Sequence, residues 1–119
     1  MLWDLTRVAD ASVPNQAIFR TVQSAKSKGG VRVNLTNVPP GNYRLALRQI
    51  GFEKNDAYSA YLEMHAPSQL NRAQEKTLRD AASGSPEFER ELMIGVDGKF
   101  SETLPLRENN VLLLTLTRQ

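Results

Sequence analysis

The hydrophobic period of the sequence changes twice along the chain, and this constrains the fold more than any other feature. Apolar and polar residues alternate over residues 31–35 and again over 43–48, a period of two that indicates half-buried strands. Between residues 51 and 85 the period lengthens to about 3.6, which indicates helix, and beyond residue 86 the alternation returns. Strands on both sides of one helical segment predict an antiparallel β-sheet protein, because a parallel sheet needs helices between its successive strands.

Two turn sequences predict hairpins. Residues 39–42 read Pro-Pro-Gly-Asn, which combines fixed φ angles with two residues that tolerate positive φ, so residues 31–50 are predicted to form one hairpin with a longer loop. Asp97-Gly98 is a strong two-residue hairpin signal, and it predicts that a strand with Phe88, Leu92, Ile94 and Val96 inward pairs with residues 100–104.

The two ends of the chain differ in regularity. Residues 111–117 are apolar on both faces, which predicts a central strand covered from each side. Near the N-terminus, residues 17–22 could form a strand, and residues 24–30, rich in Ser, Lys and Gly, are predicted to form a mobile loop.

Two short helices are predicted between the strands. The first begins at Asn55 or Asp56, both good N-cap residues, and places Tyr58, Tyr61 and Leu62 along one stripe. Pro67 limits its length.

The second helix has its own start and stop signals. Asn71 is its predicted N-cap, Gln74 three residues later completes a capping box, and Gly84 is a candidate for the position just after the helix.

Together these signals define a fold class. The prediction is a mainly β protein, an antiparallel β-sandwich with a short two-helix insertion at about residues 55–83, forming a single domain over residues 1–119. Hydrophobic residues make up 40% of the chain, enough for one buried core.

Composition excludes several classes of function. The net charge is only +2, and the basic residues are scattered among acidic ones, so we predict no nucleic-acid partner. The chain has no cysteine and one histidine, His65, which rules out disulfides, thiolate nucleophiles and multi-histidine metal sites. No apolar run is long enough to span a membrane, and residues 1–7 do not resemble a signal peptide. We therefore expect a soluble domain without a membrane partner, and the cellular compartment stays open.

The best candidate for catalysis is a row of acidic residues. Glu87, Glu89 and Glu91 would project from one face of a strand with about 7 Å between neighbours. Inverting glycosidases hold two carboxylates about 6.5–9.5 Å apart, but on either side of the sugar rather than in a row. The row is therefore interpreted as a solvated strand face, and no catalytic residue, metal site or cofactor site is predicted.

Aromatic residues offer a different kind of site. Tyr58 and Tyr61, with Trp3, Phe52 and Tyr43, could provide platforms on which sugar rings stack. Aromatic residues also fill cores and interfaces, and two tyrosines three positions apart on a helix share one side for packing reasons alone. Both interpretations of these aromatic residues therefore stay open, a sugar-binding platform and a packing interface, and the interface is favoured.

Four segments, taken in order, resemble those of a known family. They are residues 2–6 (Leu-Trp-Asp-Leu-Thr), 40–45 (Pro-Gly-Asn-Tyr-Arg-Leu), 55–64 (Asn-Asp-Ala-Tyr-Ser-Ala-Tyr-Leu-Glu-Met) followed by Pro67 and Gln74, and the closing stretch 97–113. In this order they resemble the C-terminal β-sandwich accessory domain that follows the (β/α)₈ barrel in family 39 glycoside hydrolases, the β-xylosidase family. The chain departs from the family at His65-Ala66, where the family tends to have glycine.

The resemblance implies a role without catalysis. It implies a parent enzyme that is a retaining hydrolase of xylosides, with an acid/base glutamate and a nucleophilic glutamate that both belong to the barrel. The motif that carries them has no counterpart here, so the chain alone is expected to be inactive. Its expected partner is the catalytic barrel of the parent enzyme or a neighbouring subunit, and xylo-oligosaccharide is a further candidate. The predicted contact residues are Tyr58, Tyr61, Leu62, Trp3 and Phe52.

Two hypotheses follow about the exposed surface of the chain. The stripe formed by Tyr58, Tyr61 and Leu62 is expected to be partly exposed in the isolated chain and to pack on the absent partner. The alternative function is a free-standing carbohydrate- or protein-binding β-sandwich module, which would show a row of exposed aromatic side chains with polar groups between them.

Overall fold

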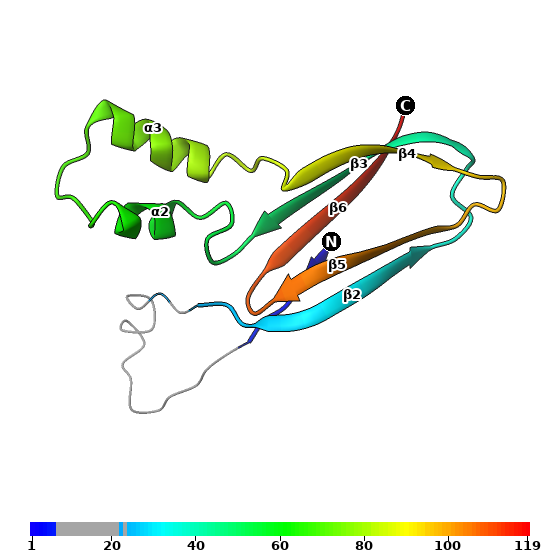
Figure 1. Ribbon diagram of the computed structural model, residues 1–119, viewed down its shortest axis with the longest axis horizontal. Coiled ribbons are helices and arrows are strands. Elements are labelled where there is room, and N and C mark those ends of the chain that lie inside the picture. The colour runs from blue at the N-terminus through cyan, green and yellow to red at the C-terminus, as the bar shows by residue number, and fades with distance from the viewer. Residues whose placement is uncertain (7–21, 23) are drawn as a thin grey trace.

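The computed structural model describes residues 1–6, 22 and 24–119, and its elements lie in two layers with a helical projection (Figure 1). The strands are β1 (Leu2–Trp3), β2 (Ser27–Leu35), β3 (Gly41–Ile50), β4 (Phe88–Ile94), β5 (Phe100–Arg107) and β6 (Val111–Arg118). The helices are α2 (Ala57–Glu63) and α3 (Arg72–Ala81). The predicted fold class, mainly β with a two-helix insertion, is confirmed.

All strand pairs among the described residues are antiparallel, and they form two sheets. The larger sheet has the order β1-β6-β3-β4, and the smaller consists of β2 and β5. Successive side chains of a strand point to opposite faces, so each sheet offers one face to the other and one face to the outside.

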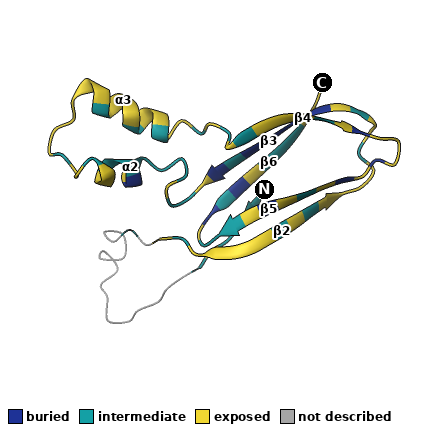
Figure 2. Cartoon of the chain, viewed as in Figure 1, coloured by how far each residue is buried: buried dark blue, intermediate teal, exposed yellow. Residues whose placement is uncertain are grey.

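The core lies between the two sheets. Leu47 of β3 packs with Leu104 of β5 and Leu112 of β6, all at most 1% exposed. A second cluster joins the fully buried Leu45 of β3 to Tyr43, Ile94 and Phe100. Figure 2 shows buried residues along β3, β5 and β6, while β2 and both helices are largely exposed. Burial of these leucines is the main stabilising contribution, at roughly 25 cal/mol per Å² of apolar surface.

Both predicted hairpins are wrong, because each turn carries the chain from one sheet to the other. β2 pairs with β5 rather than with β3, and β4 pairs with β3 rather than with β5. The two connections lie together at one end of the sandwich, where the Val38 N–H donates to the Gly98 carbonyl at 3.0 Å. A Cβ at Gly98, whose φ is +60°, would come within 2.9 Å of the Val38 carbonyl oxygen, so these loops need glycine to approach each other.

Other strand predictions are confirmed only in part. Val96, expected to face inward, is 95% exposed because β4 ends at Ile94. Residues 27–30, expected to be loop, belong to β2 because they pair with β5. Residues 17–21 of the first predicted strand lie outside the described residues. The strand predicted at 111–117 is β6, an inner strand as expected, but its outer side is not fully covered, since Leu113 is 39% exposed.

The two helices form a projection that we call the arm, residues 55–85. They pack against each other and extend beyond the end of β3 (Figure 1). The Asp56 carboxylate accepts from the Tyr58 and Ser59 N–H groups and caps α2, and Asn71 and Gln74 form the predicted capping box of α3. Gly84 has a positive φ of +72° but lies two residues beyond Ala82, the residue that caps α3, so the helix ends earlier than predicted.

The base of the arm is closed by Asn55. Its side-chain Nδ2 donates to the Gln49 carbonyl at 2.7 Å and to the Ser85 carbonyl at 3.3 Å, and its Oδ1 accepts from the Gly84 N–H at 2.9 Å. One amide therefore joins the chain entering the arm to the chain leaving it. No helix in the described part of the chain is long and apolar enough to cross a membrane.

Candidate interaction surfaces

The predicted contact residues Tyr58, Tyr61 and Leu62 share one side of α2. The two tyrosine rings stack with 6.5 Å between their centroids, and the Tyr61 hydroxyl donates to the Pro67 carbonyl at 3.0 Å. Tyr58 and Leu62 are 46% and 40% exposed, and Tyr61 is half-buried. The stripe is thus partly exposed, as expected; its contact with a partner stays a prediction.

Trp3 and Phe52 lie elsewhere, so the five predicted contact residues do not form one site. Trp3 is 66% exposed on β1, on the outer face of the four-stranded sheet. Phe52, in the turn after β3, lines a cleft at the base of the arm. Tyr43, considered as a sugar platform, is a core residue that is 5% exposed and donates its hydroxyl to the Pro39 carbonyl at 2.8 Å.

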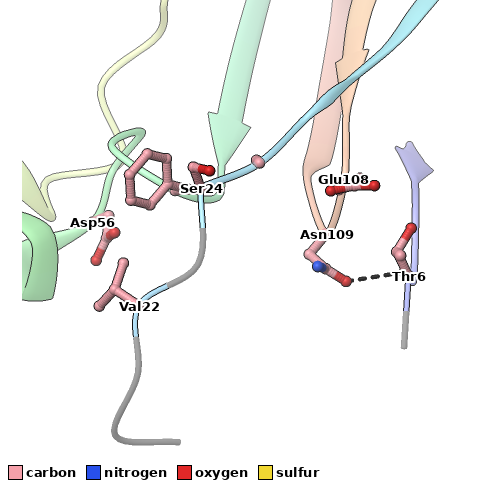
Figure 3. A pocket seen from close by; sticks show the side chains of 8 residues that line it. Thr6, Val22, Ser24, Asp56, Glu108 and Asn109 are labelled. Atoms are coloured by element: carbon pink, nitrogen blue, oxygen red, sulfur yellow. Dashed lines mark hydrogen bonds between the residues drawn. The ribbon is translucent and has the colours of Figure 1, made fainter. Parts of the chain in front are cut away.

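The cleft has a volume of about 220 Å³, and its polar lining is engaged in local structure. Figure 3 shows Asp56 beside Val22 and Ser24 on one side and Glu108 and Asn109 on the other, with the Thr6 N–H donating to Asn109 Oδ1 at 3.0 Å. Asp56 is the cap of α2. The cleft therefore offers carboxylates that already have protein partners.

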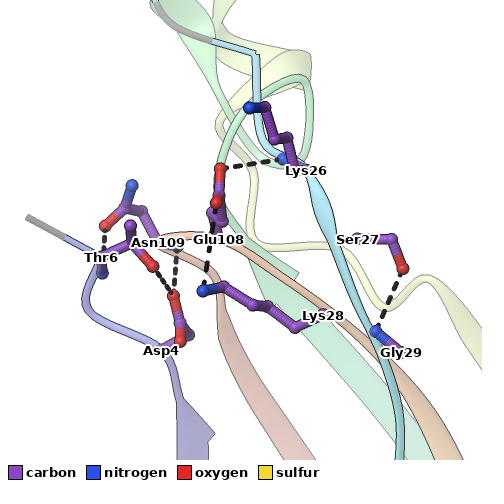
Figure 4. A network of polar contacts seen from close by, with 8 residues as sticks. All are labelled: Asp4, Thr6, Lys26, Ser27, Lys28, Gly29, Glu108 and Asn109. Carbon is purple, nitrogen blue, oxygen red and sulfur yellow. Dashed lines mark hydrogen bonds and ion pairs between the residues drawn. The ribbon is translucent and has the colours of Figure 1, made fainter. Parts of the chain in front are cut away.

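The second carboxylate of the cleft belongs to a polar network that joins distant parts of the chain (Figure 4). Glu108 accepts from the Lys26 N–H at 3.2 Å and lies 3.9 Å from Lys28 Nζ. Beside it, Asp4 accepts from the Thr6 hydroxyl at 2.7 Å and from the Asn109 N–H at 3.1 Å. These contacts tie the segment that follows β1 and the start of β2 to the turn between β5 and β6.

Two carboxyl groups of this region have shifted pKa values. The hydrogen bonds from the Thr6 hydroxyl and the Asn109 N–H hold the pKa of Asp4 below its ordinary value. At Asp56 burial raises the pKa, but the hydrogen bonds from Ser59, Glu53 and Tyr58 outweigh it and hold the pKa below its ordinary value. Both carboxyls are charged at neutral pH, which suits an acceptor of hydrogen bonds rather than a general acid.

The acidic row is a solvent-facing surface, as predicted. Glu89 and Glu91 are exposed on the outer face of β4, opposite Ala46 and Arg44 of β3. Glu87 precedes β4 and pairs with Lys54 at 2.5 Å. His65 is exposed as well, and the described residues contain no group of three or more His, Cys, Asp or Glu placed to hold a metal ion.

The structure also reveals residues that the sequence reasoning missed. Ile50, Val111 and Leu113 lie on the same outer face as Trp3, and Ile50 and Leu113 are 58% and 39% exposed. The two-sided apolar pattern of residues 111–117 could have pointed to Val111 and Leu113, but it was interpreted as cover from both sides; Ile50 joins them only through the register. Just before β6, Asn110 is fully buried, and both polar atoms of its side chain lack a partner among the described residues.

Comparison with known proteins finds the same fold in solved structures of glycoside hydrolases. No family model and no curated protein matches the chain. Among solved structures, a family 39 glycoside hydrolase (GH39) from Xanthomonas axonopodis pv. citri is 33% identical over 99% of this chain, with a TM-score of 0.90. The monomeric β-xylosidase from Caulobacter crescentus CB15 is 32% identical over 98% of the chain, with a TM-score of 0.84. A bacterial orthologue of human α-L-iduronidase, 16% identical over 83% of the chain and 18% of its own, shares the fold with a TM-score of 0.72.

These matches define the class of protein. The chain is a mainly β domain similar to one region of GH39 enzymes, as the sequence resemblance indicated. It spans only 23% of the Xanthomonas and of the Caulobacter chains. This share is consistent with a domain of a larger enzyme.

Proposed function

We propose that the chain is the non-catalytic C-terminal accessory domain of a β-xylosidase-like glycoside hydrolase and that it packs against the catalytic barrel. The observation that carries this proposal is the match of nearly the whole chain to less than a quarter of each of two such enzymes, at 33% and 32% identity. In this reading the acid/base and nucleophilic glutamates belong to the barrel, and the present chain supplies a docking surface.

The state of the carboxylates supports a structural role. A retaining glycosidase needs two carboxyl groups about 5–5.5 Å apart that face a sugar and exchange protons with it. In the cleft, Asp56 is committed to capping α2, and Glu108 to Lys26 and Lys28. Neither group can leave these partners for a substrate without loosening the arm or the start of β2.

The Caulobacter relative favours a partner within the same polypeptide. That enzyme is a monomer and contains a region 32% identical to this chain. Whatever covers the region there is the rest of its own chain rather than a neighbouring subunit. By analogy, we propose the barrel of the same molecule as the partner.

A chimera tests this proposal. The matched region of the Caulobacter β-xylosidase is replaced by residues 1–119, and hydrolysis of p-nitrophenyl β-D-xyloside is compared with that of the parent enzyme, of a version lacking the region and of the isolated chain. We expect the chimera to retain activity within about tenfold of the parent, the isolated chain to give none, and the deletion to lose activity on mild heating. A chimera no better than the deletion would contradict the proposal, and so would turnover by the isolated chain.

A sugar-binding module is the second candidate, because aromatic side chains are exposed at two places. Trp3 is 66% exposed, and Tyr58, 46% exposed, stacks with Tyr61. Titration of the labelled chain with xylo-oligosaccharides, followed in the amide spectrum, separates the two functions. Saturable shifts confined to either place would favour sugar binding, and an unchanged spectrum at millimolar sugar would favour the docking domain.

A further inference from the structure

The outer face of the four-stranded sheet carries an apolar row at one end. In the register, Trp3 of β1 stands opposite Val111 of β6, and Val111 stands opposite Ile50 of β3. Leu113 lies on the same face, two residues along β6. We call these four residues the outer patch; Trp3, Ile50 and Leu113 are 66%, 58% and 39% exposed.

Most of the rest of that face is polar, so the outer patch has a boundary; the exposed Met93 of β4 lies at the opposite end of the face. Further along the same strands, Arg44 of β3 stands between Glu91 of β4 and Thr117 of β6. Next to the outer patch, Arg48 pairs with Leu113 and marks the change from apolar to charged side chains. An apolar area with a polar border is typical of an interaction site.

The outer face of the other sheet provides the contrast. There β2 and β5 present Arg32 opposite Thr103 and Asn34 opposite Ser101, all of them exposed. The Ser101 hydroxyl donates to Asn34 Oδ1 at 2.8 Å, and the remaining polar groups of this face are exposed to water. One sheet therefore presents a face suited to water, and the other presents an apolar end that water solvates poorly.

The comparisons indicate what covers the outer patch. In the two GH39 relatives the matched region is 23% of one polypeptide, so a much larger body is attached to it, and the Caulobacter relative is a monomer. Resting on the proposed function, we propose that the outer patch is the surface on which the catalytic part of the same polypeptide docks, with Trp3 as its anchor. Tryptophan is enriched among the residues that dominate interface energies, which suits this role.

The arm then forms the rim of this interface rather than its centre. It follows Ile50 after a short turn, so it lies at the same end of the sheet as the outer patch. Its exposed apolar residues Tyr58 and Leu62 are less exposed than Trp3 and Ile50, and Tyr58 already stacks on Tyr61. The outer patch instead stands on paired strands whose backbone positions are fixed before docking, which lowers the entropic cost of binding.

Thiol labelling tests this surface directly, because the chain contains no cysteine. Ile50→Cys puts a thiol in the outer patch, Thr103→Cys puts a control thiol on the polar face of β5, and Leu62→Cys puts one on the arm. Each variant is made in the isolated chain and in the chimera, treated with a maleimide, and read by peptide mass spectrometry. We expect labelling at position 50 to be at least tenfold slower in the chimera than in the isolated chain, and labelling at position 103 to be unchanged.

The outcomes separate this inference from the proposed function. An active chimera in which position 50 labels as fast as in the isolated chain would overturn docking through the outer patch while the proposed function stands. Protection at position 62 without protection at position 50 would move the interface to the arm and would also overturn the inference. A chimera without activity would remove the proposed function, and this inference would fall with it.

Discussion

The sandwich and the arm are stabilised in different ways. All the buried hydrophobic residues of the described chain lie in strands, whereas α3 has no buried residue and α2 has only Ser59. The arm relies on caps, on the Asn55 amide and on exposed ion pairs such as Arg79–Glu75, which are each worth only about 0.3–0.5 kcal/mol. The difference indicates that the sandwich has a core of its own, while the arm depends on local polar contacts and is the less stable part.

The largest expected effect lies in the core of the sandwich. Leu112→Ala removes a fully buried side chain between the sheets and should lower the free energy of unfolding by about 2–5 kcal/mol. Urea denaturation followed by circular dichroism measures this loss. The neighbouring Leu113→Ala, at a position 39% exposed, is the matched control and should cost less than about 1 kcal/mol. Equal costs for the two variants would contradict the placement of the core.

A smaller and local effect is expected at the base of the arm. Asn55→Ala removes the amide that joins residues 49, 84 and 85, and alanine also tolerates the local φ of +49° less well than asparagine. The arm should lose about 1–3 kcal/mol of local stability. Hydrogen exchange should show faster exchange of α2 and α3 amides, with β3 and β6 amides unchanged. Uniformly faster exchange across the whole chain would contradict the independence of the arm.

The Asp56 cap should make the arm sensitive to acid. Its pKa is lower in the folded chain than its ordinary value of 3.8, so its stabilisation is present above that pH and is lost as pH falls through the folded pKa. Amide shifts of α2 followed from pH 6 to pH 2 should therefore report loss of helix below about pH 4. Asp56→Asn keeps a hydrogen-bond acceptor without the charge, so the variant should not lose helix α2 as pH falls. At neutral pH the substitution should cost less than about 1 kcal/mol of stability. If the variant still loses helix α2 at low pH, a titrating group other than Asp56 causes the loss.

The smallest effect is expected at the turn between the helices. His65 and Ala66 have φ values of +64° and +45°, in the left-handed region that glycine adopts without strain. This geometry suits glycine, the residue that the sequence resemblance led us to expect at this turn. His65→Gly should stabilise the arm by about 0.5 kcal/mol, because relief of strain exceeds the entropy cost. Ala82→Gly, at a φ of −109°, is the control and should give no gain; a gain at both positions would contradict the strain at residue 65.

Local features of this fold could be predicted from the sequence, and distant pairings could not. The caps at Asp56 and Asn71 were predicted because a side chain and the amides it accepts from lie within three residues of each other. The hairpins failed because a turn signal says that the chain reverses, not which sheet it then enters. Pairing of β2 with β5 joins residues about seventy positions apart, such as Val31 and Leu104, and no local pattern encodes it.

The candidate surfaces show the same limit. Trp3, Tyr58 and Leu62 were predicted as contact residues from their type, and their exposure agrees with that role. Ile50 and Leu113 were missed because they join Trp3 only through the register of β1, β6 and β3. A surface assembled from several strands becomes visible only when the pairing is known.

Scanning calorimetry of the chimera tests the central claim most directly, that this chain is a docking domain of a larger enzyme. If residues 1–119 pack on the catalytic part, the chimera should unfold in one cooperative transition, at a temperature above the transition of the isolated chain. Two transitions, with that of the chain at the temperature it shows alone, would contradict the claim.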